Sequence, residues 1–577
     1  MVNIIGAGLA GLSCAVTLAQ RGIPVRLIAS QPSERAQSVL AEGGINGALN
    51  VMGEDDSPEQ HAADTRKAGA DIADPAAVDD LCRHAPEILA WFQELGVPFN
   101  QENGQIIQRN FGGQKKKRTA FAKSSTGRVL MNALISACRQ YEAAGQVQRF
   151  SHHDFEDIAL RPDGAAGVWV RDQYTQEILY FGGPVVICTG GLNGFFPGRT
   201  TGTTADTGEA AARLFLDGVR MSNLEMIQFH PTTAGIAGKR CLVSEAARGE
   251  GGRLFLLRDG QPWFFMEEKY PELGNLMPRD VISREMVLLT AGAAEAAPAD
   301  PGTGKQKKSR KARKSADYSG CRPGQVYLEL RHLPAETWST KLPDLREELI
   351  HYLHLDPARE PVPVEPGIHY FMGGIDVDSR HRTNIPGLYA AGECTSQYHG
   401  ANRLGGNSTL GAVYGGITAA ETAAAELDTR PAGDCPKAGR RVPPQDAGNT
   451  ARAWEDRDTL AGGAEAAAAH APADPGFVRA LGEILYGALG IVRDHETLQA
   501  ALDQLDSLER ADPARLALAE AMLRSADFRQ ESRGAHFRAD FPEQDAAYRG
   551  MTTALYSPAG IEITLRPAGD RQPDGTE

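Results

Sequence analysis

The sequence contains no long hydrophobic run. No apolar stretch approaches the roughly 18 residues that a membrane-spanning helix needs. The first predicted strand begins at Val2, with no basic region and apolar segment ahead of it, so we expect no secretory signal peptide. These absences predict a cytoplasmic protein whose attachment to a membrane would need a partner chain.

Paired cysteines and an excess of positive charge are also missing. The eight cysteines are scattered and none forms a C-x-x-C pair, which is typical of a reducing compartment and predicts neither a zinc nor an iron–sulfur site. The 60 Lys and Arg residues face 74 Asp and Glu, for a net charge of −14. That balance argues against general nucleic-acid binding, yet it permits an anionic substrate in a locally cationic site.

The composition of the sequence is that of an ordinary globular protein. Hydrophobic residues make up 42% and charged residues 23% of the 577 positions, which excludes wholesale disorder. At about 150 residues per domain, this length predicts several domains with a large buried core.

The first thirty residues predict a strand, a glycine-rich turn, a helix and a second strand. The turn, Gly6-Ala7-Gly8-Leu9-Ala10-Gly11, fits the G-x-G-x-x-G pattern, in which glycines let a pyrophosphate approach the backbone at a helix N-terminus. This context predicts dinucleotide binding. The acidic ribose ligand usual about twenty residues on is absent. The absence of this acidic residue weakens an NAD interpretation. Ser30, which follows the second strand, could bond the ribose instead.

Further along, composition marks the domain organisation. The pattern over 146–182 alternates as in antiparallel strands, and 184–187 predicts a buried strand that leads into Thr189 and Gly190. A doubly wound nucleotide-binding domain with insertions would show this order. Two basic runs, at 115–118 and within 305–314, are interpreted as solvated surfaces, the second with docking to an acidic partner or a membrane as the alternative.

Several segments together resemble the flavoprotein subunits of the succinate dehydrogenase and fumarate reductase family. They occur in the family's order over nearly the whole chain, and they are 40–47 (LAEGGING), 228–232 (QFHPT), 244–252 (SEAARGEGG), 278–280 (PRD), 369–375 (HYFMGGI), 387–394 (GLYAAGEC), 399–408 (HGANRLGGNS) and 531–536 (ESRGAH).

The resemblance implies an α/β fold: a doubly wound, Rossmann-like FAD-binding domain with an inserted α+β capping domain and a C-terminal helical domain. The domain ranges expected from it, with the composition breaks, are 1–229 and 356–428 for the FAD-binding domain, 230–355 for the capping domain with a low-complexity insertion at 290–322, 429–475 for a linker, and 476–577 for the helical domain and tail.

The resemblance also implies a C4 dicarboxylate substrate and the residues that act on it. Arg403 and His369 would hold one carboxylate, and His230 and Ser244 would surround the other. Arg279 would donate the proton that accompanies hydride transfer from FAD N5, with Glu245 and Arg248 supplying protons to it. An arginine acid is unusual because its pKa exceeds about 12, so its reprotonation must be tightly coupled.

FAD is the cofactor that the resemblance implies. The residues expected to contact it are Gly6, Gly8, Ala10, Gly11, Ser30, Ser38, Glu42, Gly43, Gly44, Thr189, Gly190, Glu209, Glu393, Ser408 and Leu410. Gln37 stands where membrane-bound members of the family carry the histidine that links to FAD, so we expect noncovalent FAD. Because a histidyl link raises the flavin potential, its loss is expected to favour fumarate reduction.

Two alternatives stay open at this stage. L-aspartate oxidase, a near relative, also lacks the linking histidine, and Phe541-Pro542-Glu543 resembles that branch. A non-catalytic FAD-binding subunit is the other alternative, although a dead site has no need of the four cations expected around one cavity. An iron–sulfur subunit would have to be a separate chain. The enzyme is then either soluble and cytoplasmic or peripheral to the cytoplasmic membrane through partner subunits.

Overall fold

A computed structural model describes residues 1–111, 113–123, 125–236, 238–295, 318, 320–429, 473–508 and 512–568. The predicted basic segment within 305–314 lies outside the described residues, as do most of the predicted insertion and linker. The chain forms two compact units, which are Met1–Gln228 with Ile368–Glu577, and Phe229–Gly367. No helix in the described ranges is both long enough and apolar enough to cross a membrane.

A parallel five-stranded sheet organises the first unit, in the order β21-β12-β1-β2-β8. Its strands are β1 (Val2–Ile5), β2 (Val25–Ala29), β8 (Val147–Ser151), β12 (Val185–Ile187) and β21 (Leu388–Ala390). Strands β1, β12 and β21 are fully buried, as expected for a sheet with helices on both faces, whereas the edge strand β8 is mostly half-buried or exposed. The crossover order confirms the predicted doubly wound α/β fold.

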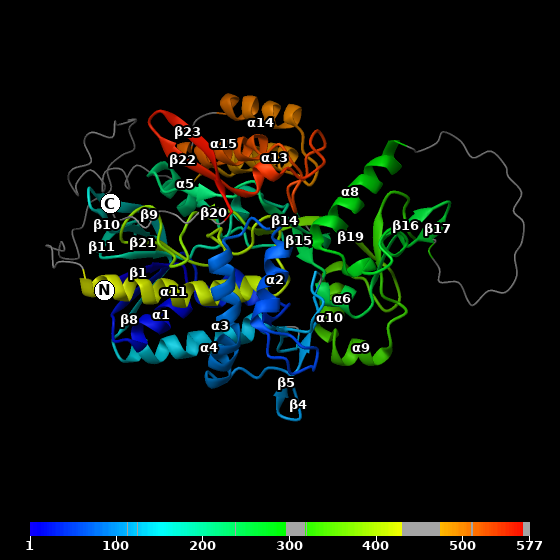
Figure 1. Ribbon diagram of the computed structural model, residues 1–577, viewed down its shortest axis with the longest axis horizontal. Coiled ribbons are helices and arrows are strands. Elements are labelled where there is room, and N and C mark those ends of the chain that lie inside the picture. Colours follow the sequence, from blue (N-terminus) through cyan, green and yellow to red (C-terminus); the bar gives the residue numbers. More distant parts are fainter. Residues whose placement is uncertain are drawn as a thin grey trace, which may run out of the picture. The chain divides into compact units, whose positions relative to one another are not determined.

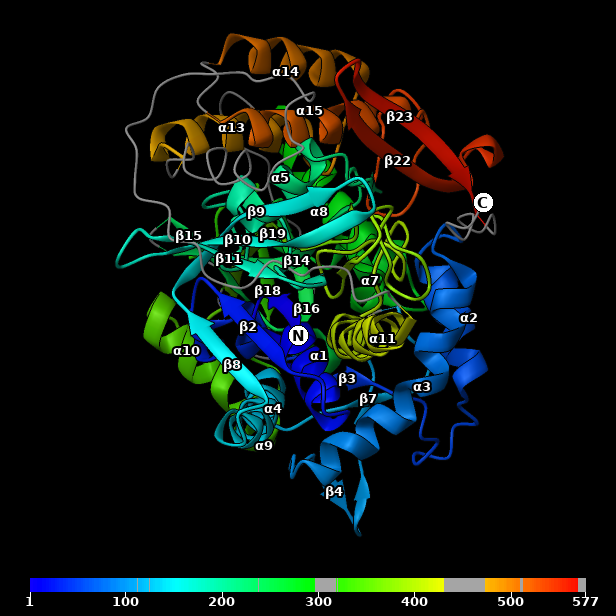
Figure 2. The ribbon, with the colours of Figure 1, turned by 90° about the vertical axis from the view of Figure 1, so that its left-hand side faces the viewer.

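Helices α1 (Leu9–Gln20) and α11 (Asn407–Thr429) lie side by side next to this sheet (Figures 1 and 2). Their close approach depends on Gly416, where a Cβ atom would lie 2.2 Å from the carbonyl oxygen of Ala10. The helices α2 (Pro58–Ala68), α3 (Pro75–Glu94), α4 (Thr126–Ala143) and α5 (Glu209–Leu216) complete the N-terminal part. Leu12, Val16 and Leu130 belong to the shared core.

Smaller sheets flank the parallel one. The antiparallel strands expected within 146–182 are present as β9 (His153–Arg161), β10 (Gly164–Asp172) and β11 (Ile178–Gly182), but the first strand of that range, β8, is parallel and belongs to the main sheet. A second small sheet pairs β3 (Ile45–Asn46), β7 (Thr119–Ala120) and β6 (Gln108–Arg109). A two-residue turn joins β4 (Gln101–Glu102) to β5 (Gln105–Ile106) in a short hairpin.

In the described residues of the C-terminal part, helices are followed by a β-hairpin (Figure 2). The helices are α13 (Pro475–Ala488), α14 (His495–Ser507) and α15 (Pro513–Phe528). Each begins after an aspartate, at 474, 494 or 512, whose carboxylate accepts an N–H of the first turn. The hairpin of β22 (Gly550–Ser557) and β23 (Gly560–Pro567), which our sequence analysis did not predict, joins β13 (Met221–Ser222) and β20 (Gly374–Ile375) in a four-stranded sheet.

The second unit is built on a six-stranded sheet, in the order β15-β14-β19-β18-β16-β17. Its strands are β14 (Ile227–Ile236), β15 (Lys239–Leu242), β16 (Arg253–Arg258), β17 (Gln261–Trp263), β18 (Val326–Glu329) and β19 (Val362–Phe371). Its helices are α6 (Glu245–Gly249), α7 (Phe265–Lys269), α8 (Arg279–Glu295), α9 (Ala335–Thr340) and α10 (Pro343–Leu353). Leu254, Leu328 and Val362 lie in its separate hydrophobic core.

Candidate active site

The glycine-rich turn after β1 is shaped for a bound anion. Gly6 has a φ of +109°, and a Cβ atom there would lie 2.1 Å from the carbonyl oxygen of Cys188. A Cβ atom at Gly11 would lie 1.9 Å from the carbonyl oxygen of Gly6, so the turn requires glycine at both positions. Helix α1 begins after Gly8 with no acidic residue in its first turn, and the Ser38 hydroxyl accepts its first N–H, that of Leu9. Its N-terminal N–H groups and the positive end of its dipole therefore suit a pyrophosphate.

Strand register places other predicted cofactor residues at the same edge of the sheet. Ile5 is aligned with Ile28 and with Ile187, and Ile187 is aligned with Ala390. The segments that follow these strand ends contain Gly6, Ser30, Thr189, Gly190 and Glu393, so the structure brings these residues to the carboxyl edge of the parallel sheet. Dinucleotides bind at that edge in doubly wound folds.

Residues from two loops and two helices complete the predicted cofactor set. The Ser38 hydroxyl accepts the N–H of Leu9 at 3.2 Å, next to Gly8 and Ala10. Arg109 donates to the carbonyls of Glu42 and Gly43, which precede Gly44. Ser408 and Leu410 lie in the first turn of α11, and Glu209 begins α5, where it pairs with Arg213.

Glu393 supplies a half-buried carboxyl at this edge. One of its carboxylate oxygens accepts the N–H of Phe371 at 3.1 Å. Burial raises the pKa of the Glu393 carboxyl to about 7, against the lowering effects of that bond and of the Arg403 charge. A half-buried carboxyl with one main-chain donor has capacity to accept hydrogen bonds from hydroxyl groups of a ribityl or ribose chain. The glycine turn, the N-terminal end of α1 and this acceptor fit FAD.

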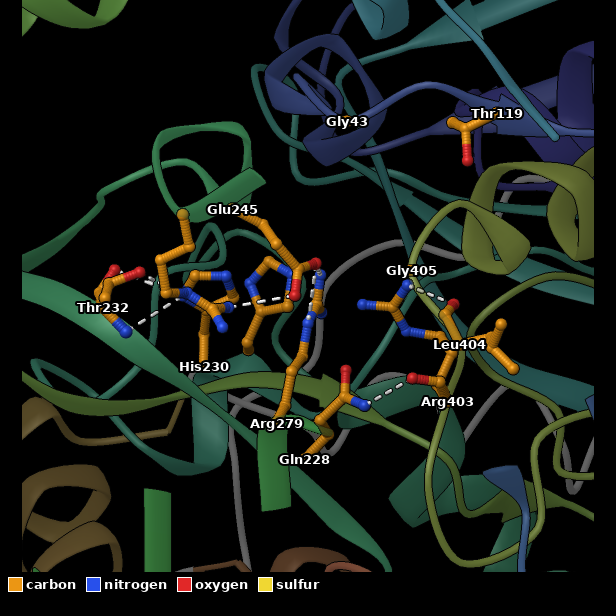
Figure 3. A network of polar contacts seen from close by, with 12 residues as sticks. Gly43, Thr119, Gln228, His230, Thr232, Glu245, Arg279, Arg403, Leu404 and Gly405 are labelled. Carbon is orange, nitrogen blue, oxygen red and sulfur yellow. Dashed lines mark hydrogen bonds and ion pairs between the residues drawn. The ribbon is translucent and has the colours of Figure 1, made fainter. Parts of the chain in front are cut away.

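The second unit holds the predicted proton-donor residues in one contact (Figure 3). Arg279, the first residue of α8, donates to one carboxylate oxygen of Glu245 from Nη2 at 2.6 Å and from Nε at 3.2 Å. Arg248 donates to the other oxygen at 2.9 Å and to the carbonyl of Asn275 at 2.9 Å. Burial lowers the pKa of the Arg248 guanidinium, while Glu245 opposes that shift. One carboxylate thus joins two buried guanidinium groups.

His230 and Ser244 come from segments that meet in the same unit. His230 lies on β14, and its Nδ1 is 3.3 Å from the Thr232 N–H nitrogen. The Thr232 hydroxyl donates to the carbonyl of Val243 at 2.8 Å, which ties the strand to the residue before Ser244. Ser244 precedes α6 and is buried, yet its hydroxyl does not cap that helix.

His369 and Arg403 belong to the first unit. The Nδ1 atom of His369 is 2.8 Å from the hydroxyl oxygen of Thr201. The Arg403 guanidinium carbon lies 4.3 Å from the centre of the Tyr370 ring, and its Nη1 is 3.4 Å from the Leu404 carbonyl oxygen. Arg403 thus contacts Tyr370, the residue after His369 on β19, whereas His369 itself contacts Thr201.

Arg118 corrects our interpretation of the basic run at 115–118 as a solvated face. Its side chain is 0% exposed and ion-paired with Asp56 at 2.8 Å and Asp64 at 2.7 Å. Lys115 and Lys117 are exposed and follow the expectation, whereas Lys116 is half-buried and donates to the Glu54 carbonyl. A run of four basic residues is typical of a solvent-exposed surface, and no local signal identifies partners more than fifty positions away. The buried ion pairs of Arg118 with Asp56 and Asp64 could therefore not be predicted from the sequence.

The fold and the glycine turn define an FAD-dependent oxidoreductase. Residues 2–409 match the family model described as "FAD binding domain", and residues 513–572 match "Fumarate reductase flavoprotein C-term". The chain is 33% identical to the succinate dehydrogenase flavoprotein subunit of Bacillus subtilis over 94% of its length and 92% of that protein. It is 33% identical to a fumarate reductase flavoprotein subunit of Mycobacterium tuberculosis, over 99% and 98%.

A solved structure agrees with these relatives. A quinol fumarate reductase chain of E. coli superposes with a TM-score of 0.80 at 27% identity and covers 100% of this chain and 98% of its own. The chain therefore belongs to the succinate dehydrogenase and fumarate reductase flavoprotein family, as the sequence resemblance predicted. These relatives give no support to the L-aspartate oxidase alternative or to a non-catalytic subunit.

Proposed function

We propose that this enzyme interconverts fumarate and succinate and that fumarate reduction is its favoured direction. The observation that carries the proposal is the Glu245 carboxylate held between the guanidinium groups of Arg279 and Arg248. Such a chain of groups suits delivery of a proton to a carbon atom next to the one that receives a hydride. The names of the relatives, succinate dehydrogenase and fumarate reductase, support the same substrate pair.

Bound FAD would supply the hydride, and this chain's residues would hold the substrate. Arg403 would bind one carboxylate through the planar fork of its guanidinium, assisted by His369. His230 and Ser244 would bind the other carboxylate. Two cationic or hydrogen-bonding sets are what a C4 dicarboxylate needs, since each end carries a negative charge. Fixing both ends would align the double bond for reaction.

The proton would come from Arg279 Nη2. An arginine keeps its proton unless a strong base and a rapid resupply are both present. A carbanion-like carbon supplies the base. Glu245, whose oxygen lies 2.6 Å from Nη2, would pass a proton back to Arg279, and Arg248 would supply that proton to Glu245. The burial of all three groups strengthens these charge interactions relative to water.

Gln37 supports noncovalent FAD and hence the direction of the reaction. Its side-chain oxygen accepts the N–H of Thr203 at 2.7 Å, and a carboxamide cannot form a histidyl link. The residues expected to retain FAD are therefore those of the glycine turn and the carboxyl edge of the sheet. Without the link, the flavin potential would be lower, which disfavours succinate oxidation.

The electron partner would be a separate iron–sulfur subunit. The cysteines of this chain form no C-x-x-C pair, so an iron–sulfur cluster would need another chain. The relatives are named as subunits, which supports such an assembly. We place the enzyme in the cytoplasm, at the surface of the membrane wherever its partners anchor it.

Steady-state rates in both directions test the proposal. Fumarate reduction is measured with a reduced viologen dye and succinate oxidation with an artificial acceptor, on Glu245→Gln and on the control Glu285→Gln. Glu285 also pairs with a cation, Lys269, but toward the surface. We expect faster fumarate reduction than succinate oxidation, and a loss of about 100-fold in Glu245→Gln only. Equal or faster succinate oxidation would refute the direction, and no turnover with FAD bound would refute the substrate.

A further inference from the structure

Three buried side-chain amides hold the segment that contains Arg403. The Gln228 Nε2 donates to the Arg403 carbonyl at 2.9 Å and to the side-chain oxygen of Asn402, the residue before Arg403, at 2.7 Å (Figure 3). After Arg403, the Gly405 carbonyl accepts from Asn46 Nδ2 at 2.8 Å and from Gln114 Nε2 at 2.6 Å. The segment that carries the arginine is therefore fixed at two points.

Asn46 is the most constrained of the three amides. It is 0% exposed, its main-chain N–H donates to the Gly406 carbonyl at 3.3 Å, and its side-chain oxygen accepts the Thr119 hydroxyl at 2.5 Å. Gly406 has a φ of +83°, and a Cβ atom there would lie 2.2 Å from the Asn46 oxygen. Asn46 and Gly406 thus fit together without room for a larger residue, which fixes the loop after Arg403.

These contacts matter because arginine is a long and flexible side chain. It loses about 2 kcal/mol of rotamer entropy when it is held in one conformation. Here the amides hold the main-chain carbonyls of residues 403 and 405, and the guanidinium carbon lies 4.3 Å from the centre of the Tyr370 ring. Burial raises the pKa of the Tyr370 hydroxyl, so the ring stays neutral and keeps its cation-binding face. The guanidinium is thereby oriented before a substrate arrives.

We propose that Gln228 and Asn46 are positioning residues for Arg403. Neither needs to touch the substrate. They set the reach and direction of the guanidinium by holding the carbonyls of residues 403 and 405. The inference rests on the proposed function, in which Arg403 binds a substrate carboxylate. The amide is suited to this role because it donates strongly without adding charge beside the arginine.

The test measures succinate binding to the FAD-loaded enzyme by the change in flavin absorbance. Gln228→Met keeps the length of the side chain but removes both donated bonds. Asn46→Asp keeps the acceptor for Thr119 but removes the bonds that Nδ2 donates to the Gly405 carbonyl and to the Asn407 side-chain oxygen, and it serves as the second variant if the first does not fold. We expect the Kd for succinate to rise about tenfold in each, the effect of losing two ordinary hydrogen bonds.

Two controls separate positioning from a loss of stability. Asn3→Leu removes a fully buried amide that donates to main-chain carbonyls of Phe181 and Pro184, outside the Arg403 loop. It should lower the thermal midpoint and leave Kd within about twofold of wild type. Arg403→Ala combined with Gln228→Met should bind succinate no more weakly than Arg403→Ala alone, because Gln228 acts through Arg403.

The outcomes distinguish this inference from the proposed function. If Arg403→Ala weakens binding strongly but Gln228→Met and Asn46→Asp leave Kd within about twofold, the positioning role is refuted and the function of Arg403 stands. If the double variant binds much more weakly than Arg403→Ala, Gln228 acts independently and the inference also fails. If Arg403→Ala leaves Kd unchanged, the proposed role of Arg403 falls, together with the inference that rests on it.

Discussion

Replacing Arg279 by lysine removes the proposed proton donor while keeping a positive charge. Arg279 makes contacts of 2.6 and 3.2 Å with one oxygen of Glu245, and the compact ammonium of lysine cannot reproduce both from the same helix start. General acid catalysis is worth about 10²- to 10⁴-fold. At 1.36 kcal/mol for each factor of ten, the barrier should rise by about 2.7–5.4 kcal/mol.

The assay is the rate of fumarate reduction by the purified, FAD-loaded variant at saturating fumarate. Arg253→Lys is the matched control, because Arg253 also makes a two-pronged contact with a glutamate, Glu267, in the same unit. We expect kcat to fall at least about 100-fold in Arg279→Lys and less than about twofold in the control, with FAD content unchanged in both. A kcat for Arg279→Lys within about tenfold of wild type would refute the reasoning.

Three further predictions concern stability and the cofactor. Burial and the Arg118 charge lower the pKa of His61 to about 3, so below pH 6.5 the folded state binds fewer protons than the unfolded state. The stability that depends on neutral His61 is therefore complete above pH 6.5 and is lost as the pH falls toward 3. In unfolding measured as a function of pH, His61→Gln should reduce the slope of this loss by up to about 1.4 kcal/mol per pH unit. Arg118→Met, which leaves Asp56 buried without its cation, should cost about 3–5 kcal/mol in denaturant unfolding, whereas the exposed Lys117→Met should change it by less than about 0.5 kcal/mol. Acid precipitation should leave the flavin in the supernatant, since Gln37 cannot link it; colour that stays with the protein pellet would contradict this.

The sequence could predict the cofactor half of the molecule because its signals are local. The turn from Gly6 to Gly11 and the flanking strand and helix lie within thirty residues, and each element follows its own hydrophobic period. The parallel sheet then follows from general rules of topology. The C-terminal hairpin of β22 and β23 was missed, although β23 alternates apolar and polar residues, because this part of the chain was expected to be helical and β22 pairs with β13 far away in the chain.

The contacts that orient the site could not be predicted, since they join distant positions. Gln228 and Arg403 are 175 residues apart, and Asn46 and Gly405 are 359 apart. Nothing in the local pattern around a glutamine or an asparagine shows that its amide will meet a particular carbonyl. Arg118 is a further example: its basic neighbours predict an exposed side chain, but the arginine is buried and ion-paired with Asp56 and Asp64.

The most direct test of the central claim is an anaerobic one. The flavin of the purified protein is photoreduced, fumarate is added, and the oxidised flavin spectrum is followed with time. The account predicts rapid return of the oxidised spectrum, with succinate as the product and no return in Arg279→Ala on the same timescale. Bound flavin that stays reduced in the presence of fumarate would contradict it.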